Sequence, residues 1–337
     1  MTAKPMQKAH GDYTFFDRDL SWLSFNERVL LESRRSSVPL MERIRFLAIY
    51  SSNLDEFYRV RIPTLMALNK LSDKGDAKKS QSSLLEVSSV VLAQLRTFGE
   101  IIKTEIIPEL KQHNIHLVYD EPIPEALRES LRYYFIHTVA SFIEIISLSE
   151  NVQFFPENNK LYLLVTISGS GQQRQWYVVN IPSDVLPRFF SLSHQQKEYI
   201  FFLEDIVKLN LTAVFPDQKI TSHSFKITRN AELDLEDEFA GNLARKIENK
   251  IKQRDFGLAT RFLYEPDFPE DALAHIKNRL NLNGANFISG GTYHNLKDLA
   301  TLPLHHPKFQ YDPWPRVDFR MHGNGSLFDE IRTRDIL

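Results

Sequence analysis

The stretch SVPLMERIRFLAIYSSNLDEFYRVRI, Ser37 to Ile62, decides how the first third of this chain folds. Pro39 suits the first turn of a helix, and the apolar residues that follow recur every three or four positions as far as Tyr50. The next six residues, SSNLDE, then place five polar side chains where the apolar stripe should continue. Either the helix stops there, or it carries polar groups into a region built to be buried.

One interpretation of SSNLDE is that one helix ends and another begins, and the residue spacing favours it. Asn53 is a good N-cap, and Asp55 and Glu56 would fall in the first turn that follows, where carboxylates are stabilising. The pattern Asn-x-x-Glu also imitates a capping box. On this interpretation the polar residues are local capping and solvated positions.

The other interpretation is that the helix continues, so that Phe46, Ile49, Tyr50, Asn53 and Phe57 share one face. Asn53 is then an amide set in an apolar wall. A carboxamide can donate and accept hydrogen bonds at once, which is the pairing that an adenine edge requires, and aromatic neighbours suit a purine ring. This arrangement makes Asn53 a candidate nucleotide-binding residue.

The residues before this stretch also follow a helical pattern. Trp22, Phe25 and Val29 recur at helical spacing. Ser24 and Glu27 have the spacing of a capping box, which predicts a cap near the start of that helix.

The residues after it continue the helical unit. The polar, glycine-bearing segment 71–83 predicts a loop. Residues 84–113 predict a long amphipathic helix that Pro108 kinks or breaks. The sequence therefore predicts an all-helical domain over residues 1–113.

The apolar period changes after Asn114, where strand-like and helical segments alternate. The pattern predicts strands at 115–120, 160–167, 174–181 and 258–265, and helices at 121–142, 235–254 and 269–282. Alternation without a repeated βαβ unit is typical of an α+β domain, which we place over residues 114–322. Residues 301–315, rich in proline, histidine and aromatic residues, predict a connector.

The composition of the 337 residues restricts the classes of function. Lysine and arginine number 41 against 43 acidic residues, a net charge of −2, so no overall field attracts nucleic acid or an anionic membrane. There is no cysteine, which excludes disulfides and thiolate metal sites. No uninterrupted apolar run reaches about 18 residues. We expect a cytoplasmic protein that binds no nucleic acid, with peripheral association as its only possible membrane contact.

Two motifs could have a function, but a structural interpretation is favoured for each. The glycine-rich segment Gly169 to Gly171 could cradle a phosphate, but a strand follows it, whereas a nucleotide loop should open a helix. A plain hairpin turn is the better interpretation. His305 and His306 could ligate a metal or accept a phosphoryl group, but Pro307 disfavours a helix and no acidic ligand follows at helical spacing. We interpret them as a surface linker pair.

Four arginines, Arg59, Arg61, Arg316 and Arg320, could contact phosphates through bidentate hydrogen bonds. Scattered arginines more often pair with carboxylates or water on a solvated face. They carry no functional assignment alone.

Long ungapped strings give the chain a family resemblance. Phe15 to Ser33 (FFDRDLSWLSFNERVLLES) and Pro39 to Phe57 (PLMERIRFLAIYSSNLDEF) closely resemble the start of the long bacterial polyphosphate kinases, the family that uses a phosphohistidine. Agreement continues in Arg254 to Phe262 (RDFGLATRF), Gly290 to Leu299 (GGTYHNLKDL) and Ser326 to Leu337 (SLFDEIRTRDIL). The resemblance covers nearly the whole chain.

The resemblance implies a multidomain α+β fold: a helical N-terminal domain, a mixed α+β head domain that contributes to dimerisation, and two phospholipase-D-like catalytic domains. Residues 323–337 would begin the first catalytic domain and the remainder is absent. The implied reaction is reversible transfer of the ATP γ-phosphate to inorganic polyphosphate, with Mg²⁺ as cofactor. By resemblance, the asparagine of SSNLDEF contacts ATP, and that residue is Asn53. No metal ligand is implied within this chain.

The phosphoacceptor histidine implied by the resemblance lies beyond Leu337, so the chain carries no catalytic residue of its own. We therefore expect a nucleotide-positioning and dimerising portion of a polyphosphate kinase that is inactive alone. The alternative is a stand-alone, non-catalytic module that dimerises and regulates a full-length kinase. The reading frame after Leu337 distinguishes them: catalytic-domain sequence supports the portion, and an immediate stop codon beside a separate full-length copy supports the regulator.

Overall fold

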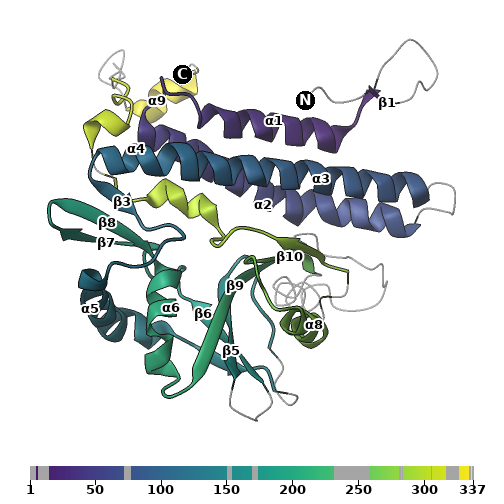
Figure 1. The fold of residues 1–337 in the computed structure, drawn as a ribbon. Coiled ribbons are helices and arrows are strands. Elements are labelled where there is room, and N and C mark those ends of the chain that lie inside the picture. Colours follow the sequence, from purple (N-terminus) through teal and green to yellow (C-terminus); the bar gives the residue numbers. More distant parts are fainter. Residues whose placement is uncertain are drawn as a thin grey trace.

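A computed structural model describes residues 5–6, 15–71, 77–149, 154–168, 174–230, 259–280, 282, 284–304, 306–315, 326–333 and 335. Three long helices lie side by side on one side of the molecule, and a mixed unit of strands and shorter helices lies beneath them (Figure 1). Two short strands, β1 (Pro5–Met6) and β2 (Phe15–Phe16), pair antiparallel before the first helix. A helical N-terminal region thus precedes a mixed region, as the sequence predicts.

Helix α1 (Arg18–Glu32) begins at an aspartate rather than at the predicted capping box. The Asp17 carboxylate accepts hydrogen bonds from the backbone N–H groups of Asp19 and Leu20, both at 2.9 Å. These bonds satisfy donors that the first turn leaves free. Ser24 and Glu27 lie inside the helix, so the prediction that they form its cap is wrong.

Helix α2 (Leu40–Leu71) runs without a break through SSNLDE. The interpretation that one helix ends and another begins there is therefore wrong, and the continuing helix is correct. The physical reason is that the polar side chains find partners on other elements: Asn53 bonds Asn26, and Asp55 bonds Lys226. These side chains therefore do not bond the nearby backbone N–H groups, as a capping side chain would.

The third helical segment is interrupted near Pro108, as predicted. Helix α3 (Ala77–Ile101) passes through a π-helical turn, η1 (Ile102–Ile106), into α4 (Ile107–Gln112). Proline has no N–H to donate and crowds the carbonyl four residues earlier, and a wider π turn relieves both conflicts. Helix α3 already includes residues 77–83, so the loop predicted over residues 71–83 extends too far at its C-terminal end.

The mixed unit is built on a six-stranded sheet in the order β11-β10-β9-β5-β6-β4. Its strands are β4 (Ile145–Ser147), β5 (Leu161–Ser168), β6 (Gln175–Ile181), β9 (Lys219–Arg229), β10 (Ala259–Tyr264) and β11 (Asn286–Ser289). Neighbours are antiparallel except β10 and β11. The predicted β5–β6 hairpin is confirmed in its pairing, and its tip, 169–173, lies outside the described residues.

Helices cover both faces of this sheet, which is why seven consecutive residues of β5 are buried. One face packs against α5 (Glu125–Tyr134), its continuation η2 (Phe135–Val139) and α6 (Leu203–Val214). The 3₁₀ turn η3 (Ala140–Phe142) follows η2 and contributes no buried residue. The other packs against α8 (Glu270–Arg279). The helix predicted at 235–254 lies outside the described residues.

A three-stranded sheet joins the mixed unit to the helices, in the order β3-β8-β7. Its strands are β3 (Ile115–Leu117), β7 (Phe189–His194) and β8 (Lys197–Phe202). Side chains of β3 and β8 belong to the same hydrophobic core as Leu47 and Tyr50 of α2. One hydrophobic core cluster therefore includes residues of both units.

The predicted connector is partly a packed segment. Turn η5 (Leu296–Thr301) lies against α2, and buried Leu302, Leu304 and Phe309 extend the helical core. Phe309 ends a short 3₁₀ turn, η6 (Pro307–Phe309), and the last helix is α9 (Leu327–Thr333). The connector's apolar side chains thus help to hold the helical unit on the mixed unit.

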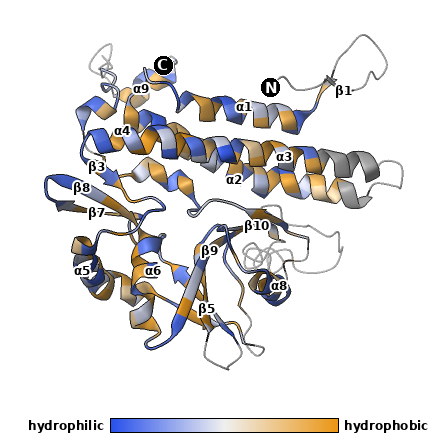
Figure 2. Ribbon diagram, in the orientation of Figure 1, coloured by the Kyte–Doolittle hydropathy of each residue, from blue (hydrophilic) through white to orange (hydrophobic). Residues whose placement is uncertain are grey.

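Polar and apolar residues alternate along the three long helices (Figure 2). Among the described residues, no helix has both the length and the apolar character needed to cross a bilayer.

Candidate functional site

The SSNLDE stretch sends its polar side chains to opposite sides of α2. Successive residues of an α-helix are rotated by about 100°, so side chains two positions apart point about 200° away from each other. Asn53 faces α1, and Asp55 faces the sheet beneath. One short stretch therefore contributes to an outer site and to an inner anchor.

Asn53 takes part in a chain of hydrogen bonds between α1 and α2. Its Nδ2 donates to Oδ1 of Asn26 at 3.0 Å, and Nδ2 of Asn26 donates to the backbone carbonyl of Tyr50 at 3.3 Å. Because a carbonyl only accepts, the Tyr50 contact requires the Asn26 amide nitrogen there and directs its oxygen to Asn53. Asn53 is half-buried, and no hydrogen bond from a described residue reaches its Oδ1.

Aromatic and aliphatic residues lie within one helical turn of each of these two asparagines in sequence. Trp22 of α1 stacks on Phe57 of α2, with ring centroids 5.0 Å apart and planes 21° apart. Phe25, next to Asn26 in sequence, and Ile49, one turn before Asn53, are about half exposed. A polar amide beside accessible apolar surface suits a flat heteroaromatic ring that needs both stacking and a hydrogen bond.

On the inner side of α2, Asp55 pairs with two cations from the sheet. Lys226 Nζ of β9 lies 2.9 and 2.8 Å from its two carboxylate oxygens, and Nη2 of Arg261 on β10 donates to Oδ1. Burial alone would raise the pKa of Asp55, but the two cations overcome that effect and lower the pKa to about 2. Asp55 is thus a carboxylate at neutral pH, and its interpretation as a solvated position is wrong.

Further hydrogen bonds fix the two cations. Lys226 donates to Oδ1 of Asn295 at 2.6 Å, and Arg261 donates to the Thr228 hydroxyl at 3.1 Å. The Arg261 guanidinium also lies over the Tyr58 ring, 4.2 Å from its centroid. These contacts fasten α2 to β9 and β10, and so fix the rotation of the helix that carries Asn53.

A second buried ion cluster lies between β7, α6 and η5. Arg188 donates through Nη2 to Glu204 and to the His294 carbonyl, the latter at 2.9 Å, and through Nη1 to Asp298 at 3.3 Å. Burial raises the pKa of Glu204, an effect that Arg188 partly offsets. These contacts join Arg188, which precedes β7, to Glu204 of α6 and to the segment 294–298, which also contains Asn295.

The other residues considered from sequence have ordinary surroundings. Arg59 pairs with Glu56 at 2.8 Å on the surface, and Arg61 pairs with Asp19 at 2.7 Å, which confirms carboxylate partners for both. His306 accepts a hydrogen bond through Nδ1 from the Lys308 backbone N–H, as a turn cap. Among the described residues, no group of three or more histidine, aspartate or glutamate side chains lies together as a metal site would require.

Arg316, Arg320, His305 and the segment 169–171 lie outside the described residues.

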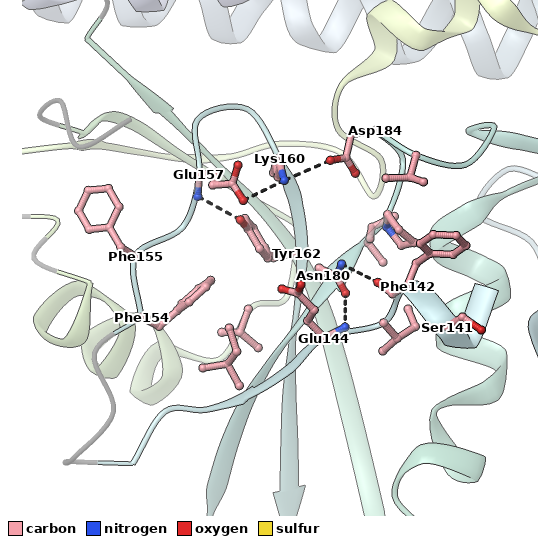
Figure 3. Close-up of a pocket in the computed structure, with 16 residues that line it drawn as sticks. Ser141, Phe142, Glu144, Phe154, Phe155, Glu157, Lys160, Tyr162, Asn180 and Asp184 are labelled. Atoms are coloured by element: carbon pink, nitrogen blue, oxygen red, sulfur yellow. Dashed lines mark hydrogen bonds and ion pairs between the residues drawn. The ribbon is translucent and has the colours of Figure 1, made fainter. Parts of the chain in front are cut away.

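A cavity of about 290 Å³ lies at the end of β4, β5 and β6 (Figure 3). Its lysine, Lys160, is held between the carboxylates of Glu157 and Asp184, at 2.8 and 3.1 Å. Asn180 ties down the loop before β4 through hydrogen bonds to its backbone. Because Lys160, the one cation among the described residues that line it, is already paired with two carboxylates, the cavity is poorly suited to an anionic ligand such as a nucleotide.

Sequence reasoning missed Asn26, Lys226 and Arg261. Asn26 interrupts the apolar pattern of α1, Lys226 stands between Phe225 and Ile227 in β9, and Arg261 stands within the largely apolar strand β10. A charged residue between apolar neighbours in a strand signals a buried ion partner, because an unpaired charge is too costly to bury. That signal identifies the residues as candidates without naming their partners.

Comparisons with known proteins agree with this architecture. Residues 15–118 match the family described as "Polyphosphate kinase N-terminal domain", and residues 126–302 match "Polyphosphate kinase middle domain". The polyphosphate kinase of Vibrio vulnificus (strain YJ016) is 33% identical over 344 residues, which cover 97% of this chain and 48% of the relative. That of Escherichia coli (strain K12) is 32% identical over 340 residues, covering 96% and 49%.

The crystal structure of polyphosphate kinase from Porphyromonas gingivalis superposes with a TM-score of 0.74 at 31% identity, covering 91% of this chain and 44% of that one. The chain spans about half the length of the curated relatives it matches.

Proposed function

The chain belongs to the polyphosphate kinase family, and from that premise we propose that it is the nucleotide-positioning and dimerising portion of an enzyme that transfers the ATP γ-phosphate reversibly to inorganic polyphosphate. In this proposal the phosphohistidine and the groups that bind Mg²⁺ are supplied by catalytic domains outside these residues. The proposed partners are ATP, polyphosphate and a second copy of the chain, contacted through the head domain.

The placement of Asn53 is the observation that supports a role in nucleotide positioning. Its amide is held by Asn26, while Asp55 fastens the same helix to Lys226 and Arg261. The Oδ1 of Asn53, to which no described residue donates, could accept a hydrogen bond from the exocyclic amino group of adenine. A preorganised amide loses little conformational entropy when the ligand binds.

Replacement of Asn53 by alanine tests this role in a polyphosphate kinase that contains this chain. We expect the KM for ATP to rise about five- to tenfold, because one neutral hydrogen bond contributes about 1 kcal/mol. The KM for polyphosphate should stay unchanged. The measurement is steady-state kinetics with each substrate varied in turn.

Ser52→Ala is the matched control, because Ser52 is the exposed neighbour of Asn53 on the same turn. It should leave both KM values at the wild-type level. Loss of folding in the Asn53→Ala chain, or an unchanged KM for ATP, would show that the residue is structural only.

The 337-residue chain alone should acquire no phosphate from ATP. Phosphoryl transfer through histidine needs an activated nucleophile and cations that face the transferring group, and the proposal assigns these to other domains. The measurement is incubation of the purified chain with γ-labelled ATP and Mg²⁺, followed by gel analysis under alkaline and acidic conditions. Acid-labile label on the chain would contradict the prediction.

A further inference from the structure

Three side-chain contacts, each about one helical turn from the next, hold α1 against α2 in a fixed register. The first is an ion pair, 2.7 Å long, and the second is a stacked pair of rings with centroids 5.0 Å apart. A spacing of three or four residues along each helix keeps all three contacts on one face. In order along α1 they are Asp19 with Arg61, Trp22 with Phe57, and Asn26 with Asn53.

Asn26 is fully buried, and both ends of its amide are engaged. Its Nδ2 donates to the Tyr50 carbonyl at 3.3 Å, and its Oδ1 accepts from Nδ2 of Asn53 at 3.0 Å. In the reverse orientation, the Asn26 oxygen would face the carbonyl and its nitrogen would face the nitrogen of Asn53, so both hydrogen bonds would be lost. Asn26 therefore has one orientation, and that orientation requires Asn53 to turn its nitrogen inward.

The orientation of Asn53 decides which atom it offers to a ligand. Its Oδ1 keeps accessible surface and receives no hydrogen bond from a described residue. An amide oxygen only accepts. The 6-amino group of adenine donates a hydrogen bond, whereas the 6-oxo group of guanine or hypoxanthine accepts one. The exposed atom of Asn53 is therefore matched to a 6-aminopurine and opposed to a 6-oxopurine.

We propose that Asn26 is a positioning residue that makes the nucleotide site specific for 6-aminopurines. Asn26 holds the Asn53 nitrogen and so keeps the Asn53 oxygen toward the base. Adenine then gains a hydrogen bond, while a 6-oxopurine meets an opposed acceptor, which costs binding energy. This role rests on the proposed function of Asn53 and adds the residue that orients it.

The nucleotide preference of a polyphosphate kinase that contains this chain tests the role of Asn26. Inosine triphosphate differs from ATP in its 6-oxo group and its protonated N1, so it probes this edge of the base alone. The wild-type enzyme should have a kcat/KM at least about tenfold higher for ATP than for inosine triphosphate. Equal values for the two nucleotides would overturn the proposal.

Asn26→Leu releases the Asn53 amide. Leucine suits the apolar core at this position, and the Tyr50 carbonyl keeps its hydrogen bond within α2. The freed amide can turn its nitrogen toward a 6-oxo group, so the preference for ATP should fall to about threefold or less. Thermal unfolding of the variant checks that it is folded. A wild-type preference in the folded leucine variant would overturn the proposal.

Asn26→Asp separates orientation from packing. In either protonation state the carboxyl group keeps an acceptor oxygen toward the Asn53 nitrogen, so the wild-type preference should remain. The buried carboxyl group should nevertheless lower the unfolding midpoint more than leucine does. A residue that acted only through the stability of the helix pair would give the opposite order, with the aspartate variant losing more of the preference, and that order would contradict the proposal.

Gln94→Leu is the matched control. Gln94 is also a buried amide that joins helices: its Nε2 donates to the Leu23 carbonyl at 3.0 Å, and its Oε1 accepts from the Tyr50 hydroxyl at 3.3 Å. It bonds neither asparagine, so its replacement should lower the unfolding midpoint and leave the preference for ATP unchanged. An equal loss of preference in Gln94→Leu and Asn26→Leu would overturn the proposal, because any loosening of the helices would then have the same effect.

Asn53→Ala distinguishes failure of this proposal from failure of the proposed function. If Asn53→Ala raises the KM for ATP and removes the preference while Asn26→Leu keeps it, Asn53 contacts the base without help from Asn26, and only the role of Asn26 is overturned. If Asn53→Ala leaves both the KM for ATP and the preference unchanged, Asn53 does not contact the base, and both proposals fail.

Discussion

Replacing Asp55 by asparagine should lower the free energy of unfolding by about 3 to 5 kcal/mol, because it leaves Lys226 and Arg261 buried without an anion. Both cations are at most 2% exposed, so solvent compensates little for the lost carboxylate. The measurement is urea-induced unfolding of the 337-residue chain, followed by circular dichroism and by tryptophan fluorescence. A loss below about 1 kcal/mol would show that the cluster adds little to the packing of α2.

Removal of one cation provides the control for this prediction. In Lys226→Met, Asp55 keeps Arg261 as its partner, so the loss of stability should be smaller than in Asp55→Asn. The double variant Asp55→Asn with Lys226→Met leaves one uncompensated positive charge, as in the wild type. It should therefore be more stable than Asp55→Asn alone, and the difference measures the coupling between the two residues.

The same carboxylate predicts how stability depends on acid. Its pKa in the folded chain is lowered from 3.8 to about 2. The folded state therefore binds this proton more weakly than the unfolded state, and the contribution of Asp55 to stability is fully present above 3.8. It is lost as the pH falls through about 2. In Asp55→Asn, this part of the acid dependence should disappear.

The continuity of α2 shows what local sequence patterns can predict and what they cannot. The apolar periodicity before SSNLDE predicted a helix as far as Tyr50, and the alternative that Asn53 shares a face with Tyr50 and Phe57 followed from spacing alone. Capping rules predicted an end at Asn53, because those rules consider only the backbone that follows. The helix continues because side chains of SSNLDE bind partners on other elements, and rules based on local sequence take no account of such partners.

The partners of these polar residues could not be predicted, because they are distant in sequence. Lys226 and Arg261 lie 171 and 206 residues from Asp55. The pairing follows from the way β9 and β10 pass under α2, and a single sequence does not specify that packing. The same applies to Asn26, whose amide faces Asn53 only because α1 folds back on α2.

Replacing Arg188 by methionine should lower the free energy of unfolding by about 3 to 5 kcal/mol at neutral pH. The side chains of Arg188 and Glu204 are 3% and 2% exposed, so the substitution leaves a carboxylate buried without its main cation. It also removes the hydrogen bonds that join β7 to the His294 carbonyl and to Asp298. Arg128→Met is the surface control, because among the described residues Arg128 pairs only with Glu125, both exposed, and its loss should cost less than about 0.5 kcal/mol.

The pH dependence of the Arg188→Met variant separates an electrostatic cause from a packing cause. The pKa of Glu204 is already raised above 4.5 by burial, and loss of Arg188 raises it further. The folded state then binds the proton more tightly than the unfolded state, so stability falls as the pH rises above the unfolded value. The deficit should be smaller near pH ~5 than near pH ~8. Adding Glu204→Gln should restore most of the stability at pH ~8, because the amide carries no charge that needs the arginine. A deficit that is equal at both pH values and persists in the double variant would mean that Arg188 acts through its volume and its backbone hydrogen bonds rather than through its charge.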